Sequence, residues 1–437
     1  MTNCNTKQIN FSSLGNKKIS GSFTGGSITS DGGLLLLREV DKKLRLTSKM
    51  AKLITEKRDK SYIRHQTLQI LRQRVFAIAA GYEDLNDHDH LRKDFTFQTV
   101  VSKEHDLAGS STLYRFESSI KRYDCMRLSN LLVEQFIASF KTPPTELTLD
   151  FDPTDFVLHG NQDKAHYHGY YKNYCYLPLY VFCNHQLLVA YLRPSNIDGA
   201  KHGGAILKLL VNKLRAVWPE VKITFRCDGA FARKHILNWC ENNNVKYLVG
   251  LSQNNRIIQL AKPTLDKAQQ LYNQTLVKQK LFTEFNYQAG TWSKSRRVVA
   301  KVEHNRYGHN LRLVVTNKTA IAQEIYELDY CLRGDMENDI KQQKLDLRSD
   351  RSGSHEFMAN QFRMLLSGFA YSLFNHLMHV YLKNTQLAKS YCHTIRIKLL
   401  KIGAIIIKNT RSIKLLFSNT FANQELFTQI INKINSS

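Results

Sequence analysis

The feature that most constrains the fold is the order of strands and helices predicted between residues 146 and 250. Residues 146–152 read Glu-Leu-Thr-Leu-Asp-Phe-Asp and residues 221–228 read Val-Lys-Ile-Thr-Phe-Arg-Cys-Asp. Both segments resemble strands in composition, and both deliver an aspartate at the carboxyl end. Further strands are predicted at 174–182, 186–192 and 246–250, and helices at 204–217 and 231–243. The order β-β-β-α-β-α-β predicts a mixed sheet flanked by helices, within the α/β class.

A second feature is the segment from Tyr330 to Lys344. On an ideal α-helix, Tyr330, Arg333, Glu337 and Lys344 project along a single stripe about 21 Å long. One carboxylate among cations along such a stripe suits an anion held by a metal, such as a nucleic-acid backbone, with Glu337 on the metal. The alternative is an amphipathic helix with Glu–Arg and Glu–Lys pairs, each worth a few tenths of a kcal/mol.

These two features combine into one candidate site. Asp152 and Asp228 at adjacent strand ends, with Glu337 across from them, form a cluster of carboxylates that repels itself unless a divalent cation is bound. Ligation by oxygen alone selects Mg²⁺ or Mn²⁺, and two such ions suit in-line displacement at a phosphate. Asp150 and Asp152 point to the same face of the strand, so either serves as the first ligand. We prefer Asp152, which lies nearer the strand end, and Asp155 is a lesser candidate.

The charge of the chain indicates the kind of partner. Its 62 basic and 37 acidic residues give a formal charge of +25 and a pI near 9.6, which is typical of proteins that bind a polyanion such as DNA. The eight cysteines form no Cys-x-x-Cys pair, which argues against zinc knuckles and a disulfide framework. The N-terminus lacks a signal-peptide pattern, and the most apolar run, 364–382, contains Ser, Asn and His. We expect a cytoplasmic, nucleoid-associated protein with a buried helix over 364–382 and no membrane span.

The pattern changes between residues 251 and 317 and predicts a β-rich insertion. Strands are expected around 281–287, 297–304 and 311–315. Trp292 lies near Arg296 and Arg297, and an aromatic ring among cations is typical of a nucleic-acid contact in which a base stacks on the ring. The alternative is a buried tryptophan whose basic neighbours face solvent.

Changes of pattern also divide the chain into domains. Residues 1–143 are predicted to form a helical domain that binds DNA ends, with Pro143-Pro144 as its boundary. Within it, the capped segment 110–117 is either the second helix of a helix-turn-helix or an ordinary short helix. Residues 144–250 and 318–385 are expected to form the two parts of the core, on either side of the insertion at 251–317. Residues 386–437 form a basic C-terminal region that either wraps DNA or packs on the protein.

The spacing Tyr-x2-Arg-x3-Glu-x6-Lys resembles the YREK signature of bacterial insertion-sequence transposases of the DDE type. Asp152-Pro-Thr154 is similar to the D-x-T on the first catalytic strand of DDE transposases with an RNase H-like core, and Arg226-Cys-Asp228 resembles the second. From about Gly25 to Leu400, the chain resembles one insertion-sequence family, numbered thirteen-eighty. The stretches that carry this resemblance include Leu149-Asp-Phe-Asp-Pro-Thr, Tyr174-Cys-Tyr-Leu-Pro-Leu-Tyr, Trp218-Pro219, Arg296-Arg-Val-Val-Ala-Lys and Asp350-Arg-Ser.

The resemblance implies an RNase H-like core and a role for each matching residue. Asp152, Asp228 and Glu337 would be catalytic metal ligands, and Tyr330, Arg333 and Lys344 would grip phosphates near the cleaved end. Trp292 would stack on a flipped base. The implied protein is a DNA transposase, homodimeric in its synaptic complex. It would bind the terminal inverted repeats of its element, cut with Mg²⁺ and join the 3′ ends to target DNA.

Two other functions fit the same residues. One is a catalytically inactive, transposase-derived protein that binds specific DNA sequences, and the other is a stand-alone RNase H-like nuclease. The complete set of Asp152, Asp228 and Glu337 argues against the first. Arg333, Lys344 and the large basic flanking regions favour strand transfer over simple hydrolysis.

Overall fold

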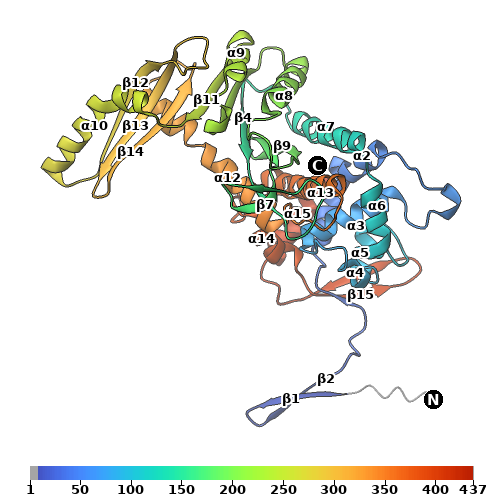
Figure 1. The fold of residues 1–437 in the computed structure, drawn as a ribbon. Coiled ribbons are helices and arrows are strands. Elements are labelled where there is room, and N and C mark those ends of the chain that lie inside the picture. Colours follow the sequence, from blue (N-terminus) through green and yellow to red (C-terminus); the bar gives the residue numbers. More distant parts are fainter. Residues whose placement is uncertain (1–7, 437) are drawn as a thin grey trace, which may run out of the picture. The chain divides into compact units, whose positions relative to one another are not determined.

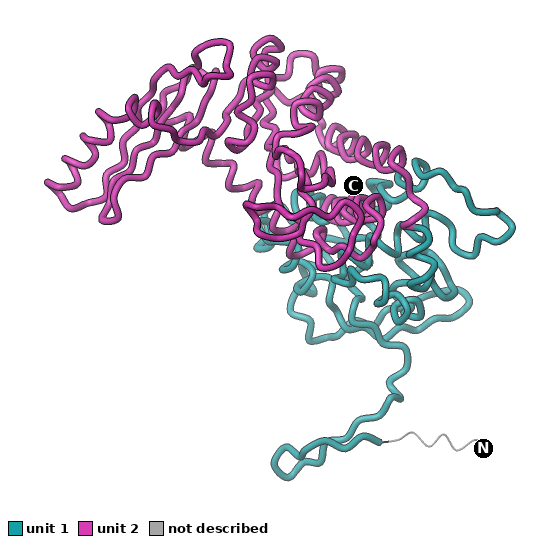
Figure 2. The backbone as a smooth tube through the Cα atoms, in the orientation of Figure 1, with its two compact units in different colours: residues 1–116, 373–437 teal, residues 117–372 magenta. Residues whose placement is uncertain are grey.

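The computed structural model describes residues 8–436 of the chain. Its elements separate into two compact units, coloured differently in Figure 2. One unit combines the residues up to Phe116 with those from Leu373 onward, and the other runs without interruption from Glu117 to Ser372. The first and the last described segments therefore belong to the same unit, whereas every predicted site residue lies in the second unit.

The second unit is built on an eight-stranded sheet with the order β12-β13-β14-β11-β10-β4-β8-β9 (Figure 1). The central strands β4, β10 and β11 pair in parallel, and the other neighbours pair antiparallel. The expected mixed α/β architecture is therefore confirmed. The strands are β4 (Glu146–Pro153), β8 (Leu179–Cys183), β9 (Gln186–Tyr191), β10 (Lys222–Cys227), β11 (Val245–Leu251), β12 (Gln279–Tyr287), β13 (Arg296–Asn305) and β14 (Gly308–Thr316). A small separate sheet contains β5 (Phe156–Val157), β6 (His166–His168) and β7 (Asn173–Tyr176).

Alternation along the strands decides which side chains face the main hydrophobic core. In β4, Leu147, Leu149 and Phe151 are buried in that core, so the intervening Asp150 and Asp152 point to the opposite face of the sheet. Four helices contribute apolar side chains to the same core. They are α7 (Arg122–Ala138), α8 (Gly203–Val217), α9 (Lys234–Asn242) and α10 (Asn255–Thr275).

The segment from 330 to 344 is helical, but it is not the single α-helix that the stripe argument assumes. It consists of the end of the π-helical η3 (Ile325–Tyr330), a turn, α12 (Arg333–Lys341) and the π-helical η4 (Gln342–Asp346). Because hydrogen bonds in a π-helix span five residues, the angles of an ideal α-helix do not hold along the whole segment. The contacts of its side chains, rather than ideal helix angles, therefore show which of them lie close together.

η3 packs on the face of the sheet opposite to the main core. Ile325 and Tyr326 pack against Leu248, Val299 and Val314, which come from β11, β13 and β14. This contact places the start of the 330–344 segment on the same face as the two aspartates of β4. The sheet thus brings residues that are far apart in the sequence to one side.

The segment from 251 to 317 contains a long helix as well as the three expected strands. α10 packs against β12 and β13 (Figure 1), and Asn254 caps it by accepting a hydrogen bond from the Ile257 N–H at 3.0 Å. Pro263 lies inside this helix, a position where proline removes a helical hydrogen bond. The strands do not form a separate sheet, since β14 pairs with β11 and continues the sheet of the core.

The apolar run at 364–382 is largely buried, as expected, with His379 and Val380 exposed near its end. It forms most of α13 (Phe357–His376) and the π-helical η5 (Leu377–Tyr381). In the first half of α13, Gln361 accepts from the Leu192 N–H at 2.7 Å and donates to the Ala190 carbonyl at 3.0 Å. Across residues 8–436, we find no helix that is both long and apolar enough to cross a membrane.

The first unit is mainly helical, and the basic C-terminal region is part of it. In a small sheet, β15 pairs with β3 from the other end of the chain, and Arg396 donates to the Ala79 carbonyl at 2.7 Å. The C-terminal region therefore packs on the protein. The elements of this unit are β1 (Ile9–Leu14), β2 (Lys17–Gly21), β3 (Ile28–Thr29), α1 (Leu34–Leu44), α2 (Leu46–Leu53), η1 (Lys60–Tyr62), α3 (Thr67–Ala80), α4 (His88–Leu91), α5 (Phe95–Val101), most of α6 (Ser110–Ser119), α14 (Cys392–Ile395), η6 (Arg396–Leu400), β15 (Ala404–Lys408), β16 (Ile413–Phe417) and α15 (Gln424–Ser436).

Candidate active site

The carboxyl ends of β4 and β10 place two aspartates side by side. The strands are parallel and Phe151 lies opposite Cys227, so Asp152 and Asp228 are the next residues on adjacent strands. Both follow residues that are buried in the main core, and their side chains therefore point to the other face. The Asp228 carboxylate also accepts a hydrogen bond from the Ala230 N–H at 3.0 Å, which fixes the turn after the strand.

Arg333, the first residue of α12, connects the helix to this strand end. Its Nη2 donates to Asp152 Oδ1 at 2.8 Å, and its Nη1 donates to Glu337 Oε1 at 2.9 Å. The Asp152 side chain is 14% exposed and the Glu337 side chain 49%, so the helix carboxylate is the more accessible of the two. The structure thus brings Asp152, Asp228 and Glu337 to one region, with a guanidinium between two of them.

Burial raises the pKa values of both aspartates. For Asp152 it is the largest cause of a rise to about 7, which Arg333 opposes and the charges of Asp228 and Glu337 increase. Burial also raises the pKa of Asp228, against the effects of the Ala230 N–H and Arg333. Carboxylates that resist ionisation for these reasons ionise more readily when another cation is bound beside them. The electrostatics of the site therefore favour a further cation.

An Asp152→Asn variant should reveal this shift through the pH dependence of stability. Because the pKa of Asp152 is raised to about 7, the folded protein holds this proton more tightly than the unfolded chain does. The wild-type protein should therefore lose stability relative to the variant as the pH rises from about 4 to about 7. Urea denaturation of both proteins below, within and above this interval measures the difference. A difference that does not change with pH contradicts the raised pKa.

The residues at this site fit a divalent cation in their chemistry. Carboxylate oxygens without His or Cys suit Mg²⁺ or Mn²⁺. Nowhere in the described range 8–436 do three Asp, Glu, His or Cys side chains stand close enough together to ligate one ion. Here the Arg333 guanidinium donates one hydrogen bond to Asp152 and another to Glu337. It therefore occupies the space between the two carboxylates. Asp152, Asp228 and Glu337 would hold a metal after Arg333 releases a carboxylate.

Tyr330 and Gly250 meet beside Asp228. A Cβ added at Gly250 would lie 2.7 Å from Tyr330 Oη, 3.1 Å from Gly229 N and 3.3 Å from the Asp228 carbonyl carbon. Glycine at the end of β11 therefore allows the tyrosine hydroxyl to approach the end of β10. Burial raises the pKa of Tyr330 to about 12, so its hydroxyl keeps its proton at neutral pH. The only signal for Gly250 in the sequence is its place at the end of a predicted strand.

A Gly250→Ala substitution should destabilise the protein by displacing Tyr330. The added methyl group overlaps the Tyr330 hydroxyl and approaches the Gly229 backbone, and overpacking of this kind costs about 1–3 kcal/mol. Adding Tyr330→Phe removes the closest clashing atom and should recover part of the loss. Urea denaturation of the single and double variants measures both effects. Equal stability of Gly250→Ala and wild type contradicts the close approach.

Lys344 in η4 contacts the loop that follows Asp152. Its Nζ donates to Asp155 Oδ1 at 2.8 Å, to the Asp155 carbonyl at 2.9 Å and to Thr154 Oγ1 at 3.4 Å. The lysine therefore ties the end of the helical segment to the loop. Asp155, the lesser candidate for the first metal ligand, is the partner of this lysine.

Arg226 also belongs to the site, although the sequence pattern alone predicts no role for it. Its Nε and Nη2 donate to the two Asp150 oxygens at 2.5 and 2.8 Å, and its Nη1 donates to the Asp329 carbonyl in η3. Both side chains of this ion pair are 9% exposed. Asp150 is thus engaged in a buried ion pair, which favours Asp152 as the first ligand. The sequence does contain a signal for this ion pair, because Arg226 and Asp150 each lie two residues before a strand-end aspartate.

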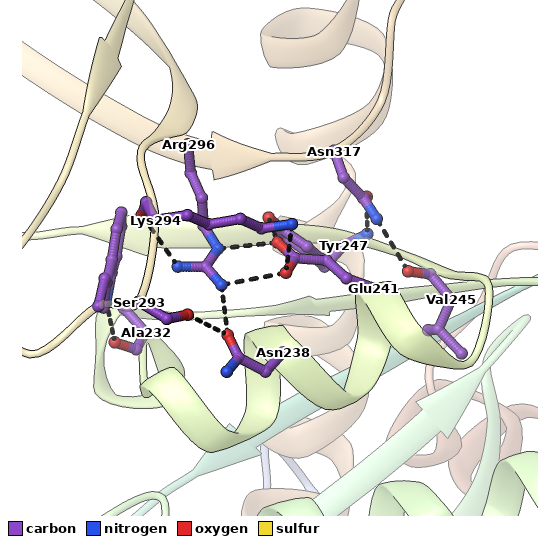
Figure 3. A network of polar contacts seen from close by, with 10 residues as sticks. Ala232, Asn238, Glu241, Val245, Tyr247, Ser293, Lys294, Arg296 and Asn317 are labelled. Carbon is purple, nitrogen blue, oxygen red and sulfur yellow. Dashed lines mark hydrogen bonds and ion pairs between the residues drawn. The ribbon is translucent and has the colours of Figure 1, made fainter.

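Trp292 and Arg296 of the insertion make contacts within the protein. Trp292 is 4% exposed, and its indole N–H donates to the Ala232 carbonyl at 3.3 Å. Arg296 donates to both Glu241 oxygens at 2.8 and 3.1 Å and to Asn238 Oδ1 at 2.6 Å (Figure 3). The arginine therefore fastens β13 to α9, and the tryptophan is part of the main core.

Arg297, the neighbour of Arg296, points to other partners. It forms an ion pair with Glu284 on β12 and donates to the Lys318 carbonyl at 2.7 Å. The expectation that Trp292, Arg296 and Arg297 contact DNA stays a prediction. The burial of the first two means that such a contact requires them to leave the partners they have here.

Comparisons with known proteins identify the family. A family model described as transposase DDE domain group 1 matches residues 11–437. No curated protein matches the chain. Among solved structures, a cryo-EM structure of a piggyBac transposase synaptic complex with hairpin DNA matches with 12% sequence identity and a TM-score of 0.45, over 85% of this chain and 80% of that one. Because the family model spans nearly the whole sequence, the protein belongs to the transposase DDE domain group 1 family.

Proposed function

We propose that the protein is a DNA transposase of the YREK group, within insertion-sequence family thirteen-eighty. It cleaves phosphodiester bonds at the ends of its element and joins the freed 3′ ends to target DNA. The observation that carries this proposal is the meeting of Asp152 and Asp228 at adjacent strand ends with the Arg333–Glu337 pair of α12. Family membership supports the reaction class, and the net charge of +25 supports a polyanionic partner.

Asp152, Asp228 and Glu337 are the residues that would hold the metal, Mg²⁺ or Mn²⁺ and two ions in number. When bound, such ions stabilise the charge on the attacking and leaving oxygens of an in-line displacement. The protein's own contribution is to keep Asp152 and Asp228 at the ends of two paired strands, where burial strengthens their interaction with any cation, and to present the more exposed Glu337 from α12.

Three further side chains prepare the site for a DNA backbone. Arg333 pairs with carboxylates here, and a bound phosphate offers its guanidinium an alternative bidentate partner. The protonated Tyr330 hydroxyl is a hydrogen-bond donor at the end of β10. Lys344 holds the loop after Asp152 through Asp155, so it acts on the first metal ligand by positioning that loop. We infer that these residues place the scissile phosphate against the carboxylates.

The proposal is tested with the wild-type protein and a duplex that carries the inverted repeats flanking its gene. We expect binding with or without Mg²⁺, and cleaved and joined products only with Mg²⁺, because EDTA removes the ions that the carboxylates hold. Gel electrophoresis of labelled DNA separates nicked from joined strands, and cross-linking of the complex tests the proposed homodimer. Nicked DNA without joined products would instead indicate a stand-alone nuclease. Binding without any cleavage would indicate an inactive DNA-binding protein.

A further inference from the structure

A cavity with cationic walls lies in the second unit, between α8, α9 and the loop before α8. Its volume is about 630 Å³. One lining residue is acidic, Asp198, whereas five carry basic or imidazole side chains. These five are Lys201, His202, Lys208, Arg233 and His235. The composition of the walls suits an anion.

The cavity adjoins the segments that carry the catalytic aspartates. Gly199 lies between two lining residues, and a Cβ added there would be 3.5 Å from Ala230 Cβ and 3.8 Å from Pro153 Cγ. Pro153 directly follows Asp152, and Ala230 donates its N–H to Asp228. One wall of the cavity therefore belongs to a loop that packs against both strand ends.

The positive charge of the cavity exceeds what its own carboxylate neutralises. Arg233 pairs with Asp198 at 2.5 Å. Within the part of the chain that the structure describes, neither Lys201 nor Lys208 has a carboxylate partner. The Lys208 ammonium lies 5.8 Å from the centre of the Trp239 ring, which orients it without neutralising it. Two lysine charges therefore remain available to a ligand.

His202, which lines the cavity, lies among cationic side chains. Burial lowers its pKa, and the charges of Arg193, Lys201 and Arg122 lower it further. Each of these neighbours is cationic, so an anion entering the cavity meets a positive potential.

We propose that this cavity binds backbone phosphates of the DNA strand next to the bond that is cut at the carboxylates. The inference rests on the proposed function and adds to it a phosphate site that does not use the Tyr330–Lys344 segment. A DNA backbone that reaches the carboxylates passes close to the loop around Gly199, because that loop contacts both strand ends. Unpaired lysines beside this path supply the charge that a phosphodiester requires.

The experiment compares two double variants that remove the same charge. The first variant, Lys201→Ala with Lys208→Ala, removes from the cavity wall the two lysine charges that have no carboxylate partner within residues 8–436. Lys222→Ala with Lys246→Ala removes two exposed lysines near the amino ends of β10 and β11, away from the aspartates at the carboxyl ends. For each protein, affinity for end DNA is measured by fluorescence anisotropy at several salt concentrations. The cavity variant should lower the slope of log affinity against log salt by about 0.9 per lost phosphate contact, or about 1.8 in all. The control should keep the wild-type slope.

A footprint on the wild-type protein provides a second measurement that needs no variant. Acetylation followed by mass spectrometry should show that end DNA protects Lys201 and Lys208 but not Lys222 and Lys246. Protection by inorganic phosphate without protection by DNA would overturn the assignment to a DNA backbone. If wild type binds and cleaves end DNA but the two double variants have the same salt slope, the inference fails and the proposed function stands. If wild type neither binds nor cleaves, both fail.

Discussion

Replacing Asp228 with asparagine should abolish DNA cleavage and leave affinity for end DNA within a few-fold of wild type. The substitution removes one carboxylate charge from the site where Asp152, Asp228 and Glu337 gather. In the proposed function Asp228 is a metal ligand, and loss of such a ligand removes several kcal/mol of transition-state stabilisation, which is about a thousandfold in rate or more. Asparagine keeps the oxygen that accepts from the Ala230 N–H, so the turn after β10 should persist. Single-turnover cleavage and anisotropy of the same labelled DNA measure the two effects.

Asp335→Asn is the matched control for this prediction. Asp335 is an exposed carboxylate on α12, the same helix that carries Glu337, and within residues 8–436 its side chain forms no hydrogen bond or ion pair with Arg333. Within the described chain it is therefore a carboxylate near the site but outside it. The control should cleave at close to the wild-type rate. Mg²⁺-dependent cleavage by Asp228→Asn at the control's rate would contradict the assignment of Asp228.

Replacing Arg226 with methionine should lower the free energy of unfolding by about 3–5 kcal/mol, because it leaves the buried Asp150 carboxylate without a partner. The Arg226 side chain is 9% exposed and donates two hydrogen bonds to Asp150, at 2.5 and 2.8 Å. Burial already raises the pKa of Asp150 despite this arginine, so the unpaired carboxylate would be costly to ionise. Urea denaturation at neutral pH measures the loss. Stability equal to wild type would show that the ion pair contributes nothing there.

A second substitution separates the two roles of this arginine. Adding Asp150→Leu to Arg226→Met replaces the buried ion pair with apolar side chains, and such exchanges are often neutral or stabilising. The free energy of unfolding of the double variant should therefore return toward that of the wild type. The hydrogen bond from Arg226 to the Asp329 carbonyl is not restored, and Asp329 immediately precedes Tyr330. DNA cleavage by the stable double variant should stay below wild type, because the start of the segment from Tyr330 to Lys344 has lost an anchor. Full activity would limit Arg226 to a role in stability.

Local patterns in the sequence were sufficient to predict the central sheet and its two strand-end aspartates. The strand expected at 146–152 is β4 (Glu146–Pro153), and that expected at 221–228 contains β10 (Lys222–Cys227). In both, every second residue belongs to the main core: Leu147, Leu149 and Phe151 in β4, and Ile223, Phe225 and Cys227 in β10. This alternation involves neighbouring residues and is therefore visible in the sequence. The strand expected at 174–182 divides into β7 and β8 at Leu177-Pro178, where proline has no N–H to donate to a ladder.

Contacts between distant residues were harder to predict. No local pattern distinguishes an arginine that binds DNA from Arg333 as it is found here, between Asp152 and Glu337. The same holds for Trp292, because the local sequence of a tryptophan among basic residues does not show whether its ring is buried or exposed. Pro263 is typical of a helix boundary, and yet α10 continues through it because packing against β12 and β13 stabilises the helix.

The sharing of one sheet between the insertion and the core has a mechanical consequence. β14 is joined to β11 by backbone hydrogen bonds, with Val314 opposite Gly250, and Gly250 is the residue against which the Tyr330 hydroxyl rests. A load applied to the insertion is therefore transmitted through this ladder to the strand against which the tyrosine packs. A chimera that exchanges the insertion for that of another transposase must reproduce the β14 register residue for residue, because a slip of one position would reverse every side chain along that strand.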